Sequence, residues 1–404
     1  VAEAALAFLD VRLQHIALAA LPLVPLGPFG QLCLDEFGAG VAEKLSPQPV
    51  GQFGGKRFVA GDEAVLQQGG ADRHVLAPQA DAVLDRAAGV ADLSGVTIDL
   101  RVYQTGGSPG QAQSMAVKAM DEGASIILGP VFAQEANAAG VAAAGRGISV
   151  LAFSNNTDIA GGNVFVLGPT FDNTARRLAS YAVRGGKNRI MIVHDRNTAG
   201  ELGKSAIQKG VAASGGTVVA VSSYEFSQNG VTGATPGIVK TARETGATAL
   251  FLTADTAGAL PLLSQSLVDS GIDKTTTRFL GLTRWDIPSA TLSLPGVQGG
   301  WFALPDPTLY AQFQGRYQAA YGEAPHPIAG LAYDGIAAIG ALARSGKDLG
   351  PRGLTQGAGF VGVTGIFRLR ADGTNERGLA IAEIRNNQVV VIDPAPRSFA
   401  GAGF

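Results

Sequence analysis

One unit recurs along this chain from about residue 96 to the C-terminus: a short β-branched run, a small turn and an Ala-rich amphipathic stretch. Short apolar runs that alternate with helical patterns are typical of parallel sheets with crossover helices. We therefore expect an α/β fold. The predicted strands are Val96–Tyr103, Ser125–Pro130, Ser149–Phe153, Arg189–Asp195, Thr217–Phe226, Ala249–Asp255 and Phe279–Trp285.

The residues that follow these runs are the first place to look for a ligand site, because ligands bind at the carboxyl ends of parallel strands. Most of them carry amide, hydroxyl or charged side chains, which suit the binding of a small polar molecule. They are Asn155, Asn156, Thr157, Arg196, Asn197, Asp255, Thr256 and Arg284.

Composition narrows the class of protein. The 404 residues exceed what one hydrophobic core usually supports, and 46% hydrophobic with 16% charged residues exclude a largely disordered chain. The net charge of −2 and the lack of a dense basic tract argue against nucleic-acid binding. Cys33 is the only cysteine, which excludes an intrachain disulfide and a thiolate zinc site, and the four histidines lie far apart, so we expect no metal and no cofactor.

The region 1–95 differs from the rest. It is irregular in pattern, and we expect it to contain at most the first strand and helix of the first lobe, with His15–Leu26 as the best candidate strand. No period of 2 or 3.6 persists over residues 38–79, which predicts the least ordered part of the chain. Ile16–Phe29 resembles part of a secretory signal, and Cys33 a lipid-modified cysteine, but the prolines within that run and the acidic residues before it weaken both interpretations.

Two glycine-rich motifs match enzyme signatures only in part. Gly106–Gly110 matches the G-x-S-x-G nucleophile elbow, yet Pro109 has no N–H for an oxyanion hole, so we predict a turn with Pro109 opening a helix. Gly357–Gly362 matches the dinucleotide fingerprint, but Gly362–Arg370 reads as a strand where a helix is needed. We predict a loop at a crossing between lobes that binds no nucleotide.

A third enzyme signature is also incomplete. His194 and Asp195 end a strand and could form half of an acid–base pair, but no serine or cysteine elbow accompanies them. We therefore expect a polar strand end and no enzyme.

The remaining signals suit binding, and each has a structural alternative. The loop 154–157 offers N–H groups, amides and hydroxyls to a carboxylate, or caps a helix with the same residues. Arg284 and Trp285 could hold an anion and an apolar group, or form a surface pair with Asp286 beside a half-buried indole. Asp255 and Thr256 could accept from an amine or cap the next helix.

With these segments in view, the chain resembles the type I periplasmic binding proteins, of which the branched-chain amino-acid-binding proteins of ABC importers are the best-known members. The resemblance covers about three quarters of the chain and rests on the order and spacing of weak motifs. They are Val96–Pro130, Ser149–Thr157, Arg189–Gly203, Tyr333–Ile336 and Phe360–Asp393 with its Arg370–Gly373 turn and Ile384–Asn387 hairpin. Phe153–Thr157 and Val193–Leu202 look most like the branch of envelope lipoproteins called penicillin-binding protein activators.

The resemblance implies a ligand site that this chain keeps only in part. The family's serine after the Gly-Pro strand end becomes Ala133, beside Phe132, and the tyrosine after the strand-ending aspartate becomes Ala199. A glutamate for the ligand's ammonium is missing near Gly258, where Asp255 is the only acid. The full set of ligand-binding candidates is Phe132, Ala133, Asn155, Asn156, Thr157, Arg196, Asn197, Asp255, Thr256, Arg284, Trp285 and Tyr333.

The fold implied is α/β, with two Rossmann-like lobes built on parallel sheets and joined by a three-segment hinge. We expect residues 96–168 and 305–363 in the first lobe and residues 169–304 and 364–404 in the second. The function implied is capture of a small polar, amino-acid-like ligand by hinge closure, without catalysis, for the membrane subunits of an ABC importer. The alternative is a periplasmic regulatory lipoprotein that binds a penicillin-binding protein.

Overall fold

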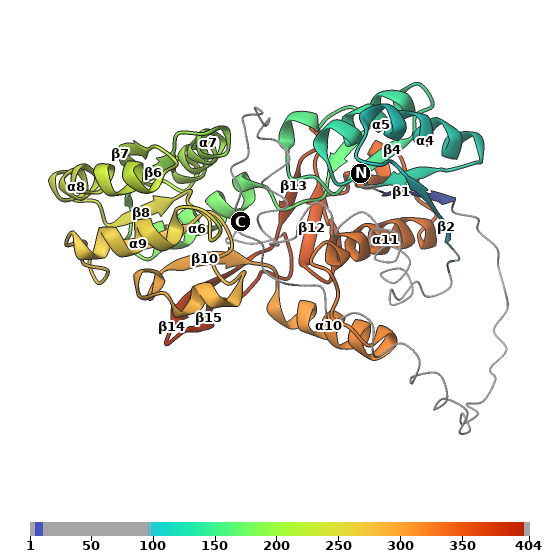
Figure 1. The fold of residues 1–404 in the computed structure, drawn as a ribbon. Coiled ribbons are helices and arrows are strands. Elements are labelled where there is room, and N and C mark those ends of the chain that lie inside the picture. The colour runs from blue at the N-terminus through green and yellow to red at the C-terminus, as the bar shows by residue number, and fades with distance from the viewer. Residues whose placement is uncertain (1–4, 11–95, 97, 400–404) are drawn as a thin grey trace, which may run out of the picture. The chain divides into compact units, whose positions relative to one another are not determined.

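The computed structural model describes residues 5–10, 96 and 98–399, and these form three β-sheets with helices packed on them (Figure 1). The strands are β1 (Ala5–Asp10), β2 (Asp99–Gln104), β3 (Ile126–Leu128), β4 (Ser149–Ala152), β5 (Val164–Val166), β6 (Arg189–Asp195), β7 (Thr217–Tyr224), β8 (Ala249–Leu252), β9 (Arg278–Gly281), β10 (Trp301–Leu304), β11 (Phe360–Gly362), β12 (Gly365–Leu369), β13 (Asn375–Arg377), β14 (Ala380–Arg385) and β15 (Gln388–Asp393). The α-helices are α4 (Pro109–Asp121), α5 (Ala133–Ala144), α6 (Phe171–Arg184), α7 (Thr198–Ala213), α8 (Gln228–Glu244), α9 (Leu260–Asp269), α10 (Pro307–Tyr321), α11 (Ala329–Arg344) and α12 (Pro351–Leu354), and the 3-10 helices are η1 (Thr157–Ile159), η2 (Ser289–Ser293) and η3 (Pro295–Val297).

The first sheet has the strand order β2-β1-β3-β4-β5. Strands β3, β4 and β5 are parallel, as the sequence predicts, whereas β1 pairs antiparallel with both β2 and β3. The predicted first strand, His15–Leu26, and the predicted poorly ordered stretch 38–79 lie outside the described residues, as does Cys33.

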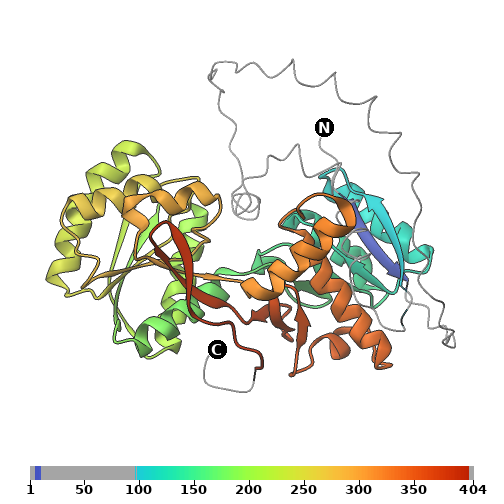
Figure 2. The ribbon, with the colours of Figure 1, turned by 90° about the horizontal axis from the view of Figure 1, so that it is seen from below.

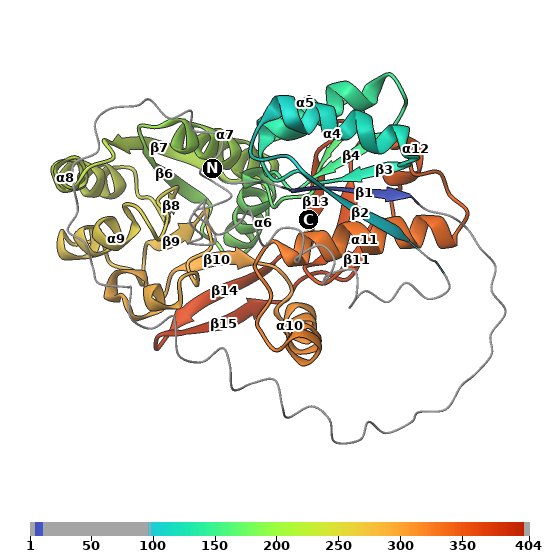
Figure 3. The ribbon, with the colours of Figure 1, turned by 45° about the vertical axis from the view of Figure 1, so that its right-hand side comes forward.

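Both faces of the parallel part of this sheet are buried. Ile126 and Leu128 of β3 pack in one core with residues of α11, whereas Ile127 between them packs in another core with residues of α4 and α5. Alternate side chains of a strand point to opposite faces, so a sheet covered on both sides needs continuous apolar runs. Figure 3 shows α4 and α5 on one side of these strands and α11 on the other.

The second sheet has the order β15-β14-β10-β9-β8-β6-β7, and its strands from β10 to β7 are parallel. It is covered on both faces in the same way: Met191 and Val193 of β6 pack with α8 and α9, and Ile190 and Ile192 pack with α6 and α7. The antiparallel hairpin β14–β15 forms the far edge (Figure 2, dark red). Its turn places Asn386 and Asn387 at φ of 50° and 62°, a backbone region that asparagine tolerates well.

Each of the seven predicted strands overlaps a strand of the structure, and the predicted turn at Arg370–Gly373 is confirmed by a hydrogen bond from Gly373 N to Arg370 O of 2.9 Å. Strands β5 and β10 were not predicted. They have three and four residues, as short as β3 and β4, which were predicted.

The third sheet contains β11, β12 and β13 in sequence order, all antiparallel. Gly357–Gly362 therefore consists of a loop and strand β11, and strand β12 follows it where a nucleotide site would need a helix. After residue 363 the chain stays in the third sheet and joins the second sheet only at β14, which begins at Ala380. The boundary between the lobes was expected earlier, between residues 363 and 364.

The chain passes three times between elements packed on the first sheet and elements of the second: from β5 to α6, from β10 to α10, and from β13 to β14. We call the linking residues 167–170, 305–306 and 378–379 the first, second and third crossings. These are the three hinge segments that the fold class implies.

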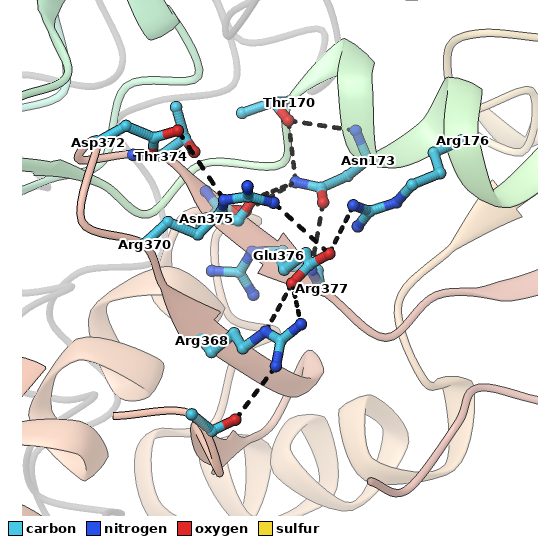
Figure 4. Close-up of polar contacts among 11 residues, drawn as sticks. Thr170, Asn173, Arg176, Arg368, Arg370, Asp372, Thr374, Asn375, Glu376 and Arg377 are labelled. Carbon is cyan, nitrogen blue, oxygen red and sulfur yellow. Dashed lines mark hydrogen bonds and ion pairs between the residues drawn. The ribbon is translucent and has the colours of Figure 1, made fainter. Parts of the chain in front are cut away.

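A charged cluster lies beside the third crossing (Figure 4). Glu376 of β13 is only 5% exposed and accepts from Arg368 and Arg176 at 2.5 Å each, with Arg370 at 3.8 Å. Burial opposes ionisation of Glu376, but the hydrogen bond from Arg368 and the charges of the arginines outweigh it and lower the pKa of this carboxyl.

This pKa shift predicts how Glu376→Gln acts. A lowered carboxyl pKa stabilises the fold above the unfolded pKa of about 4.3, and that contribution is lost as the pH falls through the folded pKa. Because the arginines are partly exposed, we expect Glu376→Gln to lower the free energy of unfolding by about 3 kcal/mol at pH 7, the low end for a broken buried pair. Urea unfolding at several pH values should show this difference shrinking below about pH 4.3.

The matched control is Glu244→Gln, which removes an exposed glutamate 3.8 Å from Lys240 on α8. It should change the free energy of unfolding by less than about 0.5 kcal/mol. A pH-independent loss in Glu376→Gln would contradict the role given to its charge.

Candidate functional site

A pocket of about 150 Å³ opens where the loop after β4 meets the N-terminal parts of α6 and α7. A cavity of this volume is enough for a molecule of about benzene's size. Its lining residues are Asn155, Asn156, Thr157, Asp158, Thr170, Phe171, Asp172, Ala199, Leu202, Ser205, Ala206 and Lys209.

The first wall is the loop 154–158, which starts at the carboxyl end of β4. Ser154 is buried, and its hydroxyl accepts a hydrogen bond from Asn156 N at 3.1 Å. The Asn156 side chain caps η1 by accepting from Asp158 N at 2.8 Å. The helix cap and the pocket wall, which the sequence left as alternatives, are therefore formed by the same residues.

The second wall begins with Thr170, the N-cap of α6. Its hydroxyl accepts from Asn173 N at 3.3 Å and from the Asn173 side-chain amide at 2.9 Å. Phe171 and Asp172 follow in the first turn of the helix and are partly exposed on the pocket. Figure 4 shows that Asn173 links Thr170 to Asn375 of β13.

One face of α7 completes the second wall. Asn197 caps this helix by accepting from Gly200 N at 2.7 Å. Ala199, Leu202, Ser205 or Ala206, and Lys209 then follow three or four residues apart, the spacing that puts side chains on one face of a helix. The Lys209 ammonium lies 4.0 Å from the Asp172 carboxylate, and both groups are well exposed. The pocket thus combines neutral donors and acceptors, the ammonium of Lys209, the carboxylates of Asp158 and Asp172, and a small apolar surface.

Of the twelve candidates from the sequence, the pocket brings together Asn155, Asn156 and Thr157. Asn197 lies next to it as the cap of α7, and Arg196 pairs with Glu225 at 2.9 Å on the exposed surface. Asp255 accepts from Gly258 N within the turn before α9, whose N-cap is Ala259 without a side-chain cap, and the Thr256 hydroxyl donates to Ile287 O. Neither Asp255 nor Thr256 lines this pocket.

Arg284 and Trp285 adopt the structural alternative given for them, except that the indole is fully buried and not half-buried. Arg284 forms a two-pronged pair with Asp286, at 2.6 and 2.5 Å. Trp285 has no exposed surface, so it cannot stack on a ligand in this structure. Its ring fills the space left by two glycines: a Cβ at Gly281 or Gly300 would lie 2.3 Å from indole atoms. In the sequence, a tryptophan after a strand is consistent with stacking on a ligand and with filling the core. Only the packing in the structure distinguishes these two roles.

Of the remaining candidates, Ala133 and Tyr333 are buried, whereas Phe132 is partly exposed as the N-cap of α5. Phe132 and Ala133 lie at the start of α5, and Ala133 is buried. Tyr333 of α11 packs edge-on against Phe313 at 5.5 Å between ring centres and accepts from Arg316 at 3.4 Å. None of the three lines the pocket.

His194 and Asp195 form a polar strand end. Asp195 accepts from the Thr253 hydroxyl at 3.2 Å and from the Tyr224 hydroxyl at closer range. Burial and the charge of Asp195 raise the pKa of Tyr224, which keeps the phenol protonated as a donor. The serine of Gly106–Gly110 caps α4, with Pro109 as the first helical residue, as predicted. Within residues 98–399, no group of three or more His, Cys, Asp or Glu is placed to hold a metal ion.

Sequence reasoning missed Thr170, Phe171, Ser205 and Lys209. The lining residues of α7 are three or four positions apart in the sequence and so form a stripe on one face of the helix. Such a stripe on an Ala-rich helix is equally typical of core packing. Thr170 follows β5, which was not predicted, so the sequence did not show that Thr170 lies after the end of a strand.

A family model described as periplasmic binding protein matches residues 66–388. No curated protein matches the chain. Among solved structures, an ABC transporter substrate-binding protein from Desulfitobacterium hafniense in complex with Leu has a TM-score of 0.58 at 16% identity, covering 77% of this chain and 93% of its own.

Two further solved structures are similar. A leucine-, isoleucine-, valine-, threonine- and alanine-binding protein from Brucella ovis, in a closed conformation, has a TM-score of 0.58 at 15% identity, covering 80% of this chain and 92% of its own. An ABC transporter solute-binding protein from R. palustris in complex with benzoate has a TM-score of 0.52 at 19% identity, covering 80% and 94%. At these identities the likeness concerns the fold.

The role of Thr170 can be tested with a pair of substitutions. Thr170→Val keeps the shape but removes the acceptor for Asn173 N, which should lower the free energy of unfolding by about 1–2 kcal/mol, as for other N-caps. Thr170→Ser keeps the hydroxyl and should lose much less. A loss in Thr170→Ser with none in Thr170→Val, measured by urea unfolding, would show that the methyl group and not the hydroxyl matters.

Proposed function

Because a model of the periplasmic binding proteins matches residues 66–388, the chain belongs to that family, and we propose that it is an extracytoplasmic solute-binding protein that captures a small polar, amino-acid-like ligand for an ABC importer. The observation that carries the proposal is the pocket itself. Its first wall extends from a strand of the first sheet, and its second wall consists of helices packed on the second sheet.

The capture mechanism follows from this arrangement. A ligand that contacts both walls interacts more strongly with a conformation in which the walls are close, and so shifts the population towards it. No bond needs to be made or broken. The proposed role is therefore binding and release, with the membrane subunits of an importer as partner.

The lining chemistry suits an amino-acid-like ligand with both charges and a modest apolar part, because Lys209 can pair with a carboxylate and Asp158 and Asp172 with an ammonium. Asn155, Asn156 and Thr157 offer amide and hydroxyl groups, Lys209 offers a positive charge, and Phe171 with Leu202 offers an apolar surface. The similar structures in complex with Leu and with benzoate each hold a carboxylic acid. The amino-acid contacts of the family are reduced here, since Ala199 supplies no phenol and Ala133 no hydroxyl.

We place the protein outside the cytoplasm on the ground of its family, with Cys33 as a candidate site for a lipid anchor. Among the residues from 98 to 399, none of the helices combines the length and the apolar character needed to cross a membrane. The alternative function is that of an envelope activator that binds a penicillin-binding protein, and the replacement of ligand-binding groups by Ala133 and Ala199 is the observation that favours it.

A ligand screen on the purified full chain tests both functions. A ligand at 100 times its dissociation constant stabilises the fold by about 2.7 kcal/mol and raises the melting midpoint. Each missing hydrogen bond to a charged group forfeits roughly 1.5–3 kcal/mol, so two losses turn micromolar binding into millimolar. We expect no strong response to leucine, isoleucine or valine, and a clear response to another amino acid or small carboxylic acid in the panel.

The outcomes separate the two functions. Micromolar leucine binding by calorimetry would overturn the residue comparison with the family. If no amino acid, small peptide or aromatic acid raises the midpoint, while a penicillin-binding protein binds, the solute-binding proposal fails.

Two lysine variants test whether this pocket is the site. Lys209→Met removes the positive charge that lines the pocket and should weaken binding of a carboxylate found in the screen about tenfold, or 1.4 kcal/mol. Lys240→Met is the matched control, because Lys240 is equally exposed and also lies near an acid, 3.8 Å from Glu244. Unchanged affinity in Lys209→Met would place the carboxylate elsewhere.

A further inference from the structure

Where the first crossing leaves the first sheet, side chains of β13 donate hydrogen bonds to three consecutive backbone carbonyls. Asn375 Nδ2 donates to Val166 O at 2.7 Å and to Gly168 O at 2.8 Å. Arg377 Nε donates to Leu167 O, between them, at 3.0 Å. Asn375 and Arg377 are two residues apart on β13, so both side chains point to the same face of the strand, towards the crossing.

Both donor side chains are buried, and each forms further hydrogen bonds that fix its position. Asn375 is 4% exposed, and its side-chain oxygen accepts from Asn173 Nδ2 at 2.7 Å. Arg377 is 4% exposed and also donates to Asp334 of α11 at 3.0 Å and to the Thr364 hydroxyl at 2.6 Å. A buried carbonyl without a partner is costly, so these bonds fix the path of the crossing.

The same network reaches the other two crossings. Arg377 precedes the third crossing by one residue. Asp306 N, in the second crossing, donates to Thr364 O at 3.3 Å, and the Thr364 hydroxyl is held by Arg377 and Asp334. One arginine thus contacts, directly or through Thr364, all of the segments that connect the two larger sheets.

Both walls of the pocket are attached to the clamped segment. Gly168 N donates to Ser154 O at 3.0 Å, at the start of the first wall, and a Cβ at Gly168 would lie 2.6 Å from that oxygen. Thr170, two residues later, begins the second wall, and its partner Asn173 is the residue that bonds Asn375. Neither Asn375 nor Arg377 lines the pocket.

We propose that Asn375 and Arg377 are positioning residues: by clamping the carbonyls of residues 166–168 they set the separation of the two pocket walls without touching a ligand. Loss of either residue weakens the attachment of the first crossing to β13. The walls then sample a wider range of separations even when no ligand is bound. This inference concerns the geometry of the walls and does not depend on which ligand the pocket takes.

Distances between spin labels test the proposal on the full chain. With Cys33→Ser as background, nitroxides at Asn137 of α5 and Gln208 of α7, both exposed, report on a helix of each larger sheet. We expect one narrow distance distribution without further substitution. Asn375→Ala should broaden it and add a second maximum, measured well below the melting midpoint.

The control is Asn163→Ala. Asn163 is also a partly buried amide that donates to two backbone carbonyls, Gly140 O at 3.0 Å and Ile148 O at 2.8 Å, but neither carbonyl belongs to a crossing. It should lower the melting midpoint as Asn375→Ala does and leave the distance distribution narrow. A merely structural role for Asn375 predicts the same narrow distribution in both variants, and that result would overturn the proposal.

Arg377→Lys is the second variant and keeps the inference testable if Asn375→Ala does not fold. A lysine keeps the charge opposite Asp334 but lacks the planar fork that also reaches Leu167 O. We expect the same broadening with the far-UV spectrum unchanged. An unaltered distribution in a folded Arg377→Lys protein would show that the bond to Leu167 does not position the walls.

Discussion

The structure depends on how backbone groups are satisfied where the chain leaves one sheet for the next. At the end of β5 the carbonyls of residues 166–168 have no neighbouring strand, and side chains of Asn375 and Arg377 replace it. Asp334, fully buried, balances the charge of Arg377. A buried pair of this kind adds little net stability but strongly favours one arrangement over others, because removing either partner leaves a buried charge. The position of both pocket walls follows from this one constraint.

The polar network and the apolar cores have separate roles. Apolar runs on β3, β4, β6 and β8 bury both faces of each sheet and fix the two large halves of the fold. Leu167 and Leu379 of the crossings also pack into these cores. The crossings are short, and their backbone groups are held by specific hydrogen bonds, which are directional where apolar packing is not. A binding protein of this family therefore has its recognition surface where directional bonds are concentrated.

Sequence reasoning predicted the elements that show a hydrophobic period in the chain. It missed the features that depend on contacts between residues distant in the sequence. The strand Arg189–Asp195 and the helix after it were predicted because seven and sixteen residues are long enough to show a pattern. Asn155, Asn156 and Thr157 were found because they follow a recognisable strand. The full burial of Trp285 was not predicted because the glycines that make room for its ring are four residues before it and fifteen after it. The three-stranded sheet moved the last crossing beyond the expected boundary, since β13 has only three residues and its role depends on partners more than two hundred positions away.

The stripe on α7 has a consequence for how this protein could change over time. Ala199, Leu202 and Ser205 face the pocket from a helix whose backbone is fixed by its own cap and by the core beneath it. The clamp at the first crossing binds backbone carbonyls, which every residue type supplies. Replacements along the stripe can therefore give a new specificity without any compensating change in the scaffold. Under the proposed function, proteins that descend from such a chain can bind different ligands while their main-chain trace stays the same.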